Sequence, residues 1–156
     1  MQTDKLMTRD PITLSPRATI ARAVEEMTGS GIRHLPLVDA HHRLVGVVSE
    51  RDLMHGSEGG LDRPLSEIMR TDLKTVSPDT PAHEAAYLLL RHRIGCVPVV
   101  ETDGRVVGIV TETDFVRVAY TALGGAVPVD ELETEEREAE DVSLRPATPG
   151  AAASSG

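Results

Sequence analysis

Two segments of the chain carry a glycine, a hydroxyl group and a carboxylate at the same spacing: Gly46-x-x-Ser49-x-x-Asp52 and Gly108-x-x-Thr111-x-x-Asp114. In each segment an apolar run leads directly into a stretch compatible with a helix, so the Ser or Thr stands at the helix start. Unpaired backbone amides at that point favour an anion or a polar ligand group. Simple capping of the helix by the same hydroxyl explains the pattern without a ligand. The spacing therefore indicates either a cap or one wall of a polar binding site.

Both segments belong to a longer repeat, because residues 7–54 recur as residues 69–116 with a constant offset of 62 and no insertion. The positions that are identical in the two copies are, in the first copy, Met7, Asp10, Thr13, Ser15, Pro16, Ala23, Ile32, Pro36, Val38, Arg43, Val45, Gly46, Val48, Glu50 and Asp52. A gapless repeat predicts two units with the same fold, arranged as a pseudo-twofold pair. A site on one unit should then have a counterpart on the other.

Hydrophobic patterning predicts the same elements in each copy, in the order β-α-β-β-α, and hence an α/β (α+β) fold. In the first copy these are an extended piece at 12–14, a helix at 19–30, strands at 35–38 and 44–48, and a helix that begins at 50. In the second copy we expect Thr80 as the N-cap and Pro81 as the first helical residue. The last helix, predicted at 112–123, is longer than its counterpart in the first copy.

The repeat divides the first part of the chain into two units, and the charge distribution separates these units from an acidic tail. We place the first unit at 1–62, the second at 63–127 and the tail at 128–156. Eight acids and two arginines in the tail account for −6 of the net charge of −9, which leaves −3 for the two units. The units lack the basic face that nucleic acids require. We expect a solvated or weakly helical segment at 130–140 and disorder at 143–156; a tail without a specific partner, which only aids solubility, is the simplest interpretation.

Other residue types exclude several function classes. Cys96 is the single cysteine, so no intramolecular disulfide forms, and a buried structural thiol is favoured over a nucleophile. No leader or long apolar run is present, so we expect a cytoplasmic protein that does not enter a membrane. The adjacent His41 and His42 lack the convergent spacing of a metal site. No nucleophile elbow, phosphate loop or pair of catalytic carboxylates is found, and we predict no enzyme activity, metal or cofactor.

The order of the motifs resembles that of the CBS domain, named after cystathionine beta-synthase, twice over about residues 5–120. The first copy matches with Thr13-x-Ser15-Pro16, with Gly31-Ile32-Arg33-His34-Leu35-Pro36-Leu37-Val38-Asp39 and with Gly46-Val47-Val48-Ser49-Glu50-Arg51-Asp52. The second matches with Thr75-x-Ser77-Pro78, with Ile94-Gly95-Cys96-Val97-Pro98-Val99-Val100 and with Gly108-Ile109-Val110-Thr111-Glu112-Thr113-Asp114. The resemblance implies a tandem pair, or Bateman module, whose two units pack through their β-sheets.

The resemblance also implies that clefts between the units bind an adenosine-containing ligand: AMP, ADP, ATP or S-adenosylmethionine. Asp52 and Asp114 match the family's ribose carboxylate, and Ser49 and Thr111 match its helix-start hydroxyl. Ile32 and Ile94 match the apolar adenine wall, with the backbone of Thr13 and Thr75 nearby. Each of these residues also has an ordinary structural role, as a helix cap, a first-turn acid or a core isoleucine.

Cations distinguish the two copies. Arg33 and His34 precede a buried strand, where a cation is costly unless it faces a cleft or an anionic partner. Arg51 stands beside Asp52 as a second phosphate contact, or as a surface arginine paired with a neighbouring acid. The corresponding residues of the second copy are Gly95, Cys96 and Thr113. We therefore predict one cleft suited to a phosphorylated adenosine, AMP or ATP, and another that is neutral, weaker or empty unless Arg91, His92 or Arg93 compensates.

Three functions remain open from the sequence. The first is a regulatory module that senses an adenine nucleotide and signals in trans to a protein target, through a change of conformation or oligomeric state. The second is a ligand-free dimerisation or scaffold module. The third is an enzyme acting on a nucleotide, for which we find no base or nucleophile. The family implies a homodimer, whose interface the apolar residues of the last helix, Val116, Val118, Ala119 and Leu123, would extend.

Overall fold

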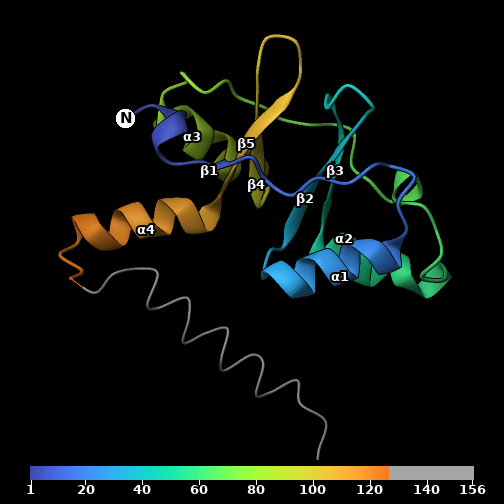
Figure 1. Ribbon diagram of the computed structural model, residues 1–156. Helices are drawn as coiled ribbons and strands as arrows, with labels where there is room; N and C mark the ends of the chain where they lie inside the picture. Colours follow the sequence, from blue (N-terminus) through green and yellow to red (C-terminus); the bar gives the residue numbers. More distant parts are fainter. Residues whose placement is uncertain (127–156) are drawn as a thin grey trace, which may run out of the picture. The chain divides into compact units, whose positions relative to one another are not determined.

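The computed structural model describes residues 1–126, and residues 1–119, which hold both copies of the repeat, form one compact unit. The tail segments 130–140 and 143–156 lie outside the described residues. The elements, labelled in Figure 1 where there is room, are η1 (Thr3–Lys5), β1 (Thr8–Arg9), α1 (Ile20–Ser30), β2 (His34–Val38), β3 (Leu44–Ser49), α2 (Glu50–Gly56), η2 (Ser57–Gly59), η3 (Leu65–Glu67), α3 (Ala82–His92), β4 (Cys96–Val100), β5 (Val106–Thr111) and α4 (Glu112–Ala122). The predicted α/β class is confirmed.

The extended piece before the first helix of each copy pairs through one residue instead of forming a strand. Leu14 lies parallel to Leu37, and its N–H donates to the carbonyl of Pro36 at 3.2 Å. Val76 lies parallel to Val99 in the same way. Pro16 and Pro78 follow two residues later in the two copies, and a proline has no N–H to continue a ladder. Each copy therefore has a β-hairpin to which one extra residue is paired, at β2 in the first copy and at β4 in the second.

The helix starts were predicted correctly for α1 but not for α3. Thr19 is the N-cap of α1, where its Oγ1 accepts from the N–H of Arg22 at 3.2 Å. The prediction of Thr80 as N-cap is wrong, because its Oγ1 accepts instead from the N–H of Ser77 at 3.0 Å. The helix begins at Ala82, whose N–H donates to the carbonyl of Met1 at 2.9 Å. The carbonyl of Met1 thus accepts the hydrogen bond from the helix start that the sequence analysis expected the side chain of Thr80 to accept.

The backbones of Arg43 and Arg105 form an antiparallel β-bridge between the two copies, and the two arginines are equivalent residues at the offset of 62. The flanking hydrogen bonds obey the same symmetry, with Leu44 N–H donating to Gly104 O at 3.0 Å and Val106 N–H to His42 O at 3.1 Å. A twofold axis is the operation that brings a residue beside its own counterpart in an antiparallel pair. The pair of arginines therefore marks the pseudo-twofold axis that the repeat predicted.

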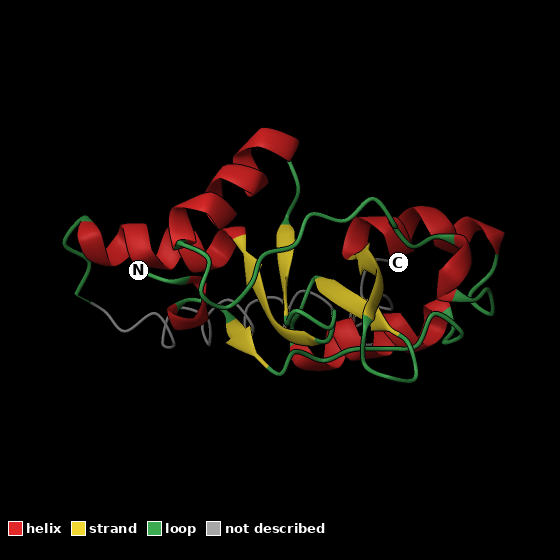
Figure 2. Ribbon diagram, turned by 90° about the horizontal axis from the view of Figure 1, so that it is seen from above, coloured by secondary structure: helices red, strands yellow, loops and turns green. Residues whose placement is uncertain are grey.

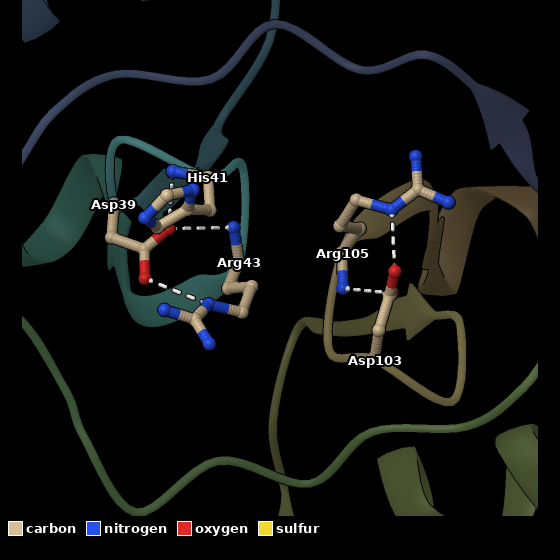
Figure 3. A network of polar contacts seen from close by, with 5 residues as sticks. All are labelled: Asp39, His41, Arg43, Asp103 and Arg105. Atoms are coloured by element: carbon tan, nitrogen blue, oxygen red, sulfur yellow. Dashed lines mark hydrogen bonds and ion pairs between the residues drawn. The ribbon is translucent and has the colours of Figure 1, made fainter.

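Each of these arginines is held by an acid of its own turn (Figure 3). Arg43 Nε donates to Asp39 Oδ2 at 3.1 Å, and Arg105 Nε donates to Asp103 Oδ2 at 2.8 Å. Asp39 Oδ1 also accepts from the N–H of His41, within the turn. The two acids occupy different positions of the repeat, since Asp39 corresponds to Glu101 and Asp103 to His41. The backbone symmetry is therefore kept while the side chains that support it differ.

The segment that leads into each copy packs against the other copy. β1, at the start of the chain, pairs antiparallel with β5 of the second copy, with Thr8 opposite Ile109 (Figure 1). Arg70, in the leading segment of the second copy, pairs with Val47 of β3 in the first copy through hydrogen bonds of 2.9 and 3.1 Å in the two directions. Thr8 and Arg70 are equivalent at the offset of 62. The two copies therefore exchange their leading segments symmetrically.

Three groups of buried apolar side chains form the interior. One lies between the helices and hairpin of the first copy: Ile20, Ala23, Met27, Leu35, Leu37, Val48, Leu53 and Leu65. A second lies in the other copy: Val76, Ala85, Leu89, Val97, Val99 and Val110. The third, Val47, Cys96 and Ile109, joins strands of both copies, and Figure 2 shows the strands gathered centrally with helices on their outer sides. The predicted packing through the sheets is confirmed.

Gly46→Ala should destabilise the protein, because a Cβ at this position of β3 would lie 2.5 Å from Met69 Sδ in the exchanged segment. A methionine can move, but its Cβ lies only 3.2 Å away, so the segment itself must shift. We expect a loss of about 1–3 kcal/mol in the free energy of unfolding, measured by urea denaturation.

Gly29→Ala is the matched control, since a Cβ there meets nothing within 4 Å. In helix α1 this change should stabilise by roughly 0.5–1 kcal/mol. A Gly46→Ala variant as stable as the unchanged protein would show that the exchanged segment does not constrain β3.

Candidate functional site

Ser49 and Asp52 form a reciprocal cap at the start of α2. Ser49 Oγ accepts from the N–H of Asp52 at 3.1 Å, and Asp52 Oδ2 accepts from the N–H of Ser49 at 2.9 Å. This capping box satisfies amides that would otherwise have no partner in the first helical turn. The motif therefore caps the helix, as one of the two interpretations predicted. The cap uses only one oxygen of the Asp52 carboxylate.

The second oxygen of Asp52 faces an arginine from the exchanged segment. Arg70 Nε and Nη2 donate to Asp52 Oδ1 at 3.3 and 3.2 Å. The Asp52 side chain is 13% exposed, whereas that of Arg70 is 58% exposed. The cation thus covers the carboxylate from the solvent side, and the pair connects α2 to the segment that leads into the second copy.

Asp114 occupies the equivalent position but has different surroundings. Its Oδ2 accepts from the N–H and the Oγ1 of Thr111 at 2.8 and 3.3 Å, and its Oδ1 accepts from Arg117 Nη1 at 3.4 Å, within the same helix. The residue is only 5% exposed. Burial raises the pKa of this carboxyl, although the Thr111 amide and Arg117 act in the opposite direction. Buried carboxylates with perturbed pKa values are concentrated at functional sites.

The residues His34 and Gly95, one from each copy, meet at the start of their strands. His34 Nε2 lies 2.5 Å from the place where a Cβ on Gly95 would be, so any larger residue at position 95 would require the imidazole to move. Burial lowers the pKa of His34, and the negative charges of Glu112 and Asp52 partly offset this effect. The imidazole therefore lies within electrostatic reach of the helix start of the second copy.

Cys96 is the counterpart of His34 and lies near the helix start of the first copy. The residue is 7% exposed, and burial raises the pKa of its thiol to about 12, with Arg70 lowering and Asp52 raising the value. A thiol with this pKa stays protonated at neutral pH and does not act as a nucleophile. Each of these strands starts beside the helix start of its own copy, since His34 is paired with Ser49 and Cys96 with Thr111. Cys96 in addition lies within electrostatic reach of Arg70 and of Asp52 in the first copy.

The other predicted site residues are more scattered. Arg33 lies 3.8 Å from Glu50 in an exposed ion pair, and Ile32 and Ile94 pack against the cores of their own copies. Arg51 and Thr113 are exposed, and Thr13 is half-buried. Two hollows of the surface hold one predicted residue each: Thr75 lines one of about 450 Å³ beside α3, and Arg51 lines one of about 510 Å³ along α2. Neither hollow is lined by Asp52 or Asp114.

Arg70 is the residue of this site that the sequence analysis missed. It belongs to the leading segment of the second copy but pairs with an acid of the first, and a repeat does not reveal which copy a leading segment packs against. One signal in the sequence could have indicated it. Met7 and Met69 are identical in the two copies, but the next residue is Thr8 in the first copy and the cation Arg70 in the second.

Residues 1–126 contain no group of three or more His, Cys, Asp or Glu side chains that could hold a metal ion. No helix in this range is both long and apolar enough to cross a membrane.

Acidification below pH 6.5 should destabilise the protein through His34, because its pKa is lower in the folded state than the ordinary value of 6.5. As the pH falls through 6.5 the unfolded chain takes up a proton that folded His34 does not, so the free energy of unfolding decreases. Between pH 6.5 and 5.5 the loss is at most about 1.4 kcal/mol for one group.

Urea unfolding at pH 7.5 and 5.5 tests this expectation on the unchanged protein and on His34→Gln. The variant should lose less stability than the unchanged protein on acidification. The exposed His92 supplies the control His92→Gln. Equal acid sensitivity of the His34→Gln variant and the unchanged protein would contradict the assignment.

Comparison with known proteins agrees with this geometry. The chain matches the CBS domain twice, at residues 4–59 and 65–120. It is 31% identical over 105 residues to an uncharacterized 17.7 kDa protein of Acidianus ambivalens, a match over 67% of this chain and 64% of that protein. It is 38% identical over 113 residues to inosine-5′-monophosphate dehydrogenase of Rhizobium tropici, a match over 70% of this chain and only 22% of that enzyme. The matched segments thus span less than two thirds of these relatives.

Solved structures give a closer match in length. A protein assigned to acetoin utilization (AcuB) from Vibrio cholerae superposes with a TM-score of 0.73 and 41% identity, over 79% of this chain and 94% of that one. The CBS domain pair of protein MJ0100, solved with 5′-methylthioadenosine and S-adenosyl-L-methionine, gives a TM-score of 0.73 and 30% identity over 78% and 98% of the two chains. CBSX2 in complex with AMP gives 0.69 and 27% over 78% and 97%. With two complete copies of the domain, exchanged leading segments and paired helix-start acids, the chain belongs to the CBS domain family as a tandem pair.

Proposed function

We propose that this chain is a cytoplasmic regulatory module that binds an adenosine-containing ligand in the clefts between its two CBS domains and signals in trans. The observation that carries the proposal is the pair of helix-start carboxylates at equivalent positions of the two copies, Asp52 with a side chain 13% exposed and Asp114 buried. A ribose diol needs an acceptor for two hydroxyl donors. Each carboxylate has one oxygen bound to its own turn, and its other oxygen, which now accepts from an arginine, would supply that acceptor.

Similar structures support this ligand class. The CBS pair of MJ0100 was solved with two adenosine compounds, and CBSX2 was solved with AMP. The two helix-start acids occur here at equivalent positions of both copies. The dehydrogenase of Rhizobium tropici shares only 22% of its length with the chain, so its activity is not part of the proposal. We propose a sensor without catalytic function, for which AMP or ATP is the regulatory ligand.

One observation favours a ligand-free scaffold as the second candidate. Both acids have protein partners in the structure, since Arg70 pairs with Asp52 and Arg117 with Asp114. Such pairs neutralise a buried acid and need no ligand. Sensor and scaffold therefore differ in one measurable property, which is whether an adenosine compound displaces or joins these contacts.

Isothermal titration of AMP, ATP and S-adenosylmethionine into the protein tests the proposal, with Asp52→Asn and Asp114→Asn as variants. The amide keeps an acceptor for the cap but presents an NH₂ group where the ribose needs an acceptor. We expect micromolar binding and a loss of at least about tenfold in one cleft for each variant, equivalent to about 1.4 kcal/mol.

Asp103→Asn, an exposed acid of a turn, is the control and should bind as the unchanged protein does. No heat and no thermal stabilisation with any of the three compounds would establish the scaffold function instead.

A homodimer is the second part of the proposal. Within residues 1–126, each of the four α-helices carries a large exposed apolar side chain: Val24 in α1, Met54 in α2, Leu90 in α3 and Val116 in α4. A contiguous exposed apolar patch marks an interaction surface, and we propose that a second copy covers these side chains. Their presence on the helices agrees with association through helical faces.

Sedimentation velocity at tens of micromolar should therefore show a dimer, and Val116→Glu should weaken it by at least about tenfold through burial of a charge. Thr102→Glu adds the same charge at an exposed turn and should leave the dimer intact. A monomer in the unchanged protein would remove the homodimer from the proposal.

A further inference from the structure

We propose that Arg70 makes the Asp52 cleft selective for adenosine compounds that carry a phosphate, whereas the Asp114 cleft does not discriminate in their favour. This inference rests on the proposed function and assigns a specificity-determining residue within it. It concerns the asymmetry between two clefts whose backbones are equivalent.

The backbone of Arg70 is fixed while its side chain is accessible. The residue exchanges hydrogen bonds of 2.9 and 3.1 Å with Val47 of β3, which hold its Cα beside the first copy. The side chain is 58% exposed beyond its contact with Asp52. The geometry therefore combines a fixed point of attachment with a guanidinium group that can change partners by rotation of its side chain alone.

The guanidinium has donors to spare. Of its five N–H groups, the contact with Asp52 Oδ1 uses those of Nε and Nη2 that point at the carboxylate. A guanidinium binds a phosphate through two parallel hydrogen bonds, and such charge-assisted bonds are stronger than neutral ones. Arg70 can therefore bind a phosphate either beside Asp52 or after a ribose has taken its place on that carboxylate.

The position of Arg70 agrees with a cleft between the copies. The thiol of Cys96, at the start of β4 in the second copy, feels the charges of both Arg70 and Asp52. The cation, the acid and the first residue of the opposite copy's strand thus lie close together. An adenosine whose ribose reached Asp52 would bring any phosphate into the neighbourhood of the guanidinium.

The second cleft lacks this cation. The equivalent of Arg70 is Thr8 of β1, which is paired with Ile109 of β5 and carries no charge. The positions that correspond to Arg33 and Arg51 are likewise neutral, namely Gly95 and Thr113. Arg117 lies 3.4 Å from Asp114 on the same helix, but it already pairs with this acid, and the Asp114 side chain is only 6% exposed. The balance of charge around Asp114 therefore does not favour a phosphate.

Titration of AMP and adenosine into two single-cleft proteins tests the inference. The Asp114→Asn background leaves only the Asp52 cleft. In it, Arg70→Thr should weaken the affinity for AMP at least tenfold and change the affinity for adenosine less than threefold. Arg70→Lys keeps the charge but loses the paired donors, and should fall between the two for AMP. In the Asp52→Asn background, Thr8→Arg should strengthen AMP relative to adenosine by at least threefold.

The controls separate this inference from the proposed function. Far-UV circular dichroism and thermal unfolding establish that each variant is folded. Binding of both compounds with an AMP-to-adenosine ratio that Arg70→Thr leaves unchanged would overturn the selectivity alone, as would an equal loss of both. If neither compound binds the unchanged protein, the proposed function fails and the selectivity fails with it.

Discussion

The structure depends on the exchange of leading segments between the two copies. Arg70 is bound to Val47 of the first copy, and Thr8 lies opposite Ile109 of the second. A buried strand edge leaves N–H and C=O groups that must find partners, and here each hairpin obtains them from the leading segment of the other copy. Neither hairpin is complete alone. The cluster of Val47, Cys96 and Ile109 adds apolar contact at the same junction, so backbone pairing and burial hold the copies in one arrangement.

This symmetric backbone carries asymmetric chemistry. Both helix-start acids accept hydrogen bonds from their own turn, but Asp52 receives its cation from the exchanged segment and Asp114 receives its own from one turn further along the helix. Burial raises the pKa of Asp114, an effect that a ligand with hydroxyl donors would oppose by stabilising the charged form. A duplicated fold therefore places two equivalent helix-start carboxylates in different charged surroundings, although the backbone pairing around them is the same.

The sequence predicted what is shared between the copies better than what passes between them. The offset of 62, the hydrophobic runs and the turn residues predicted the order of the elements, because these are local patterns repeated in register. The helix-start motif predicted that Ser49 and Asp52 would lie together. Two features escaped, Arg70 beside Asp52 and the carbonyl of Met1 at the start of α3, and both arise from contacts between segments far apart in the chain. Local propensity carries no information about such contacts, since the repeat would be unchanged if each leading segment packed on its own copy.

The position of Arg70 also suggests how binding at Asp52 reaches the rest of the molecule. A ligand shifts an equilibrium only through a difference in its interactions with two states. A phosphate that engages the Arg70 side chain acts on a residue whose backbone belongs to the junction between the copies, next to Met69 and its close contact with Gly46. The corresponding residue at the other junction, Thr8, offers no charge through which a phosphate could act. We therefore expect the Asp52 cleft to change the relation between the copies on binding a nucleotide, and the Asp114 cleft to contribute affinity without that coupling.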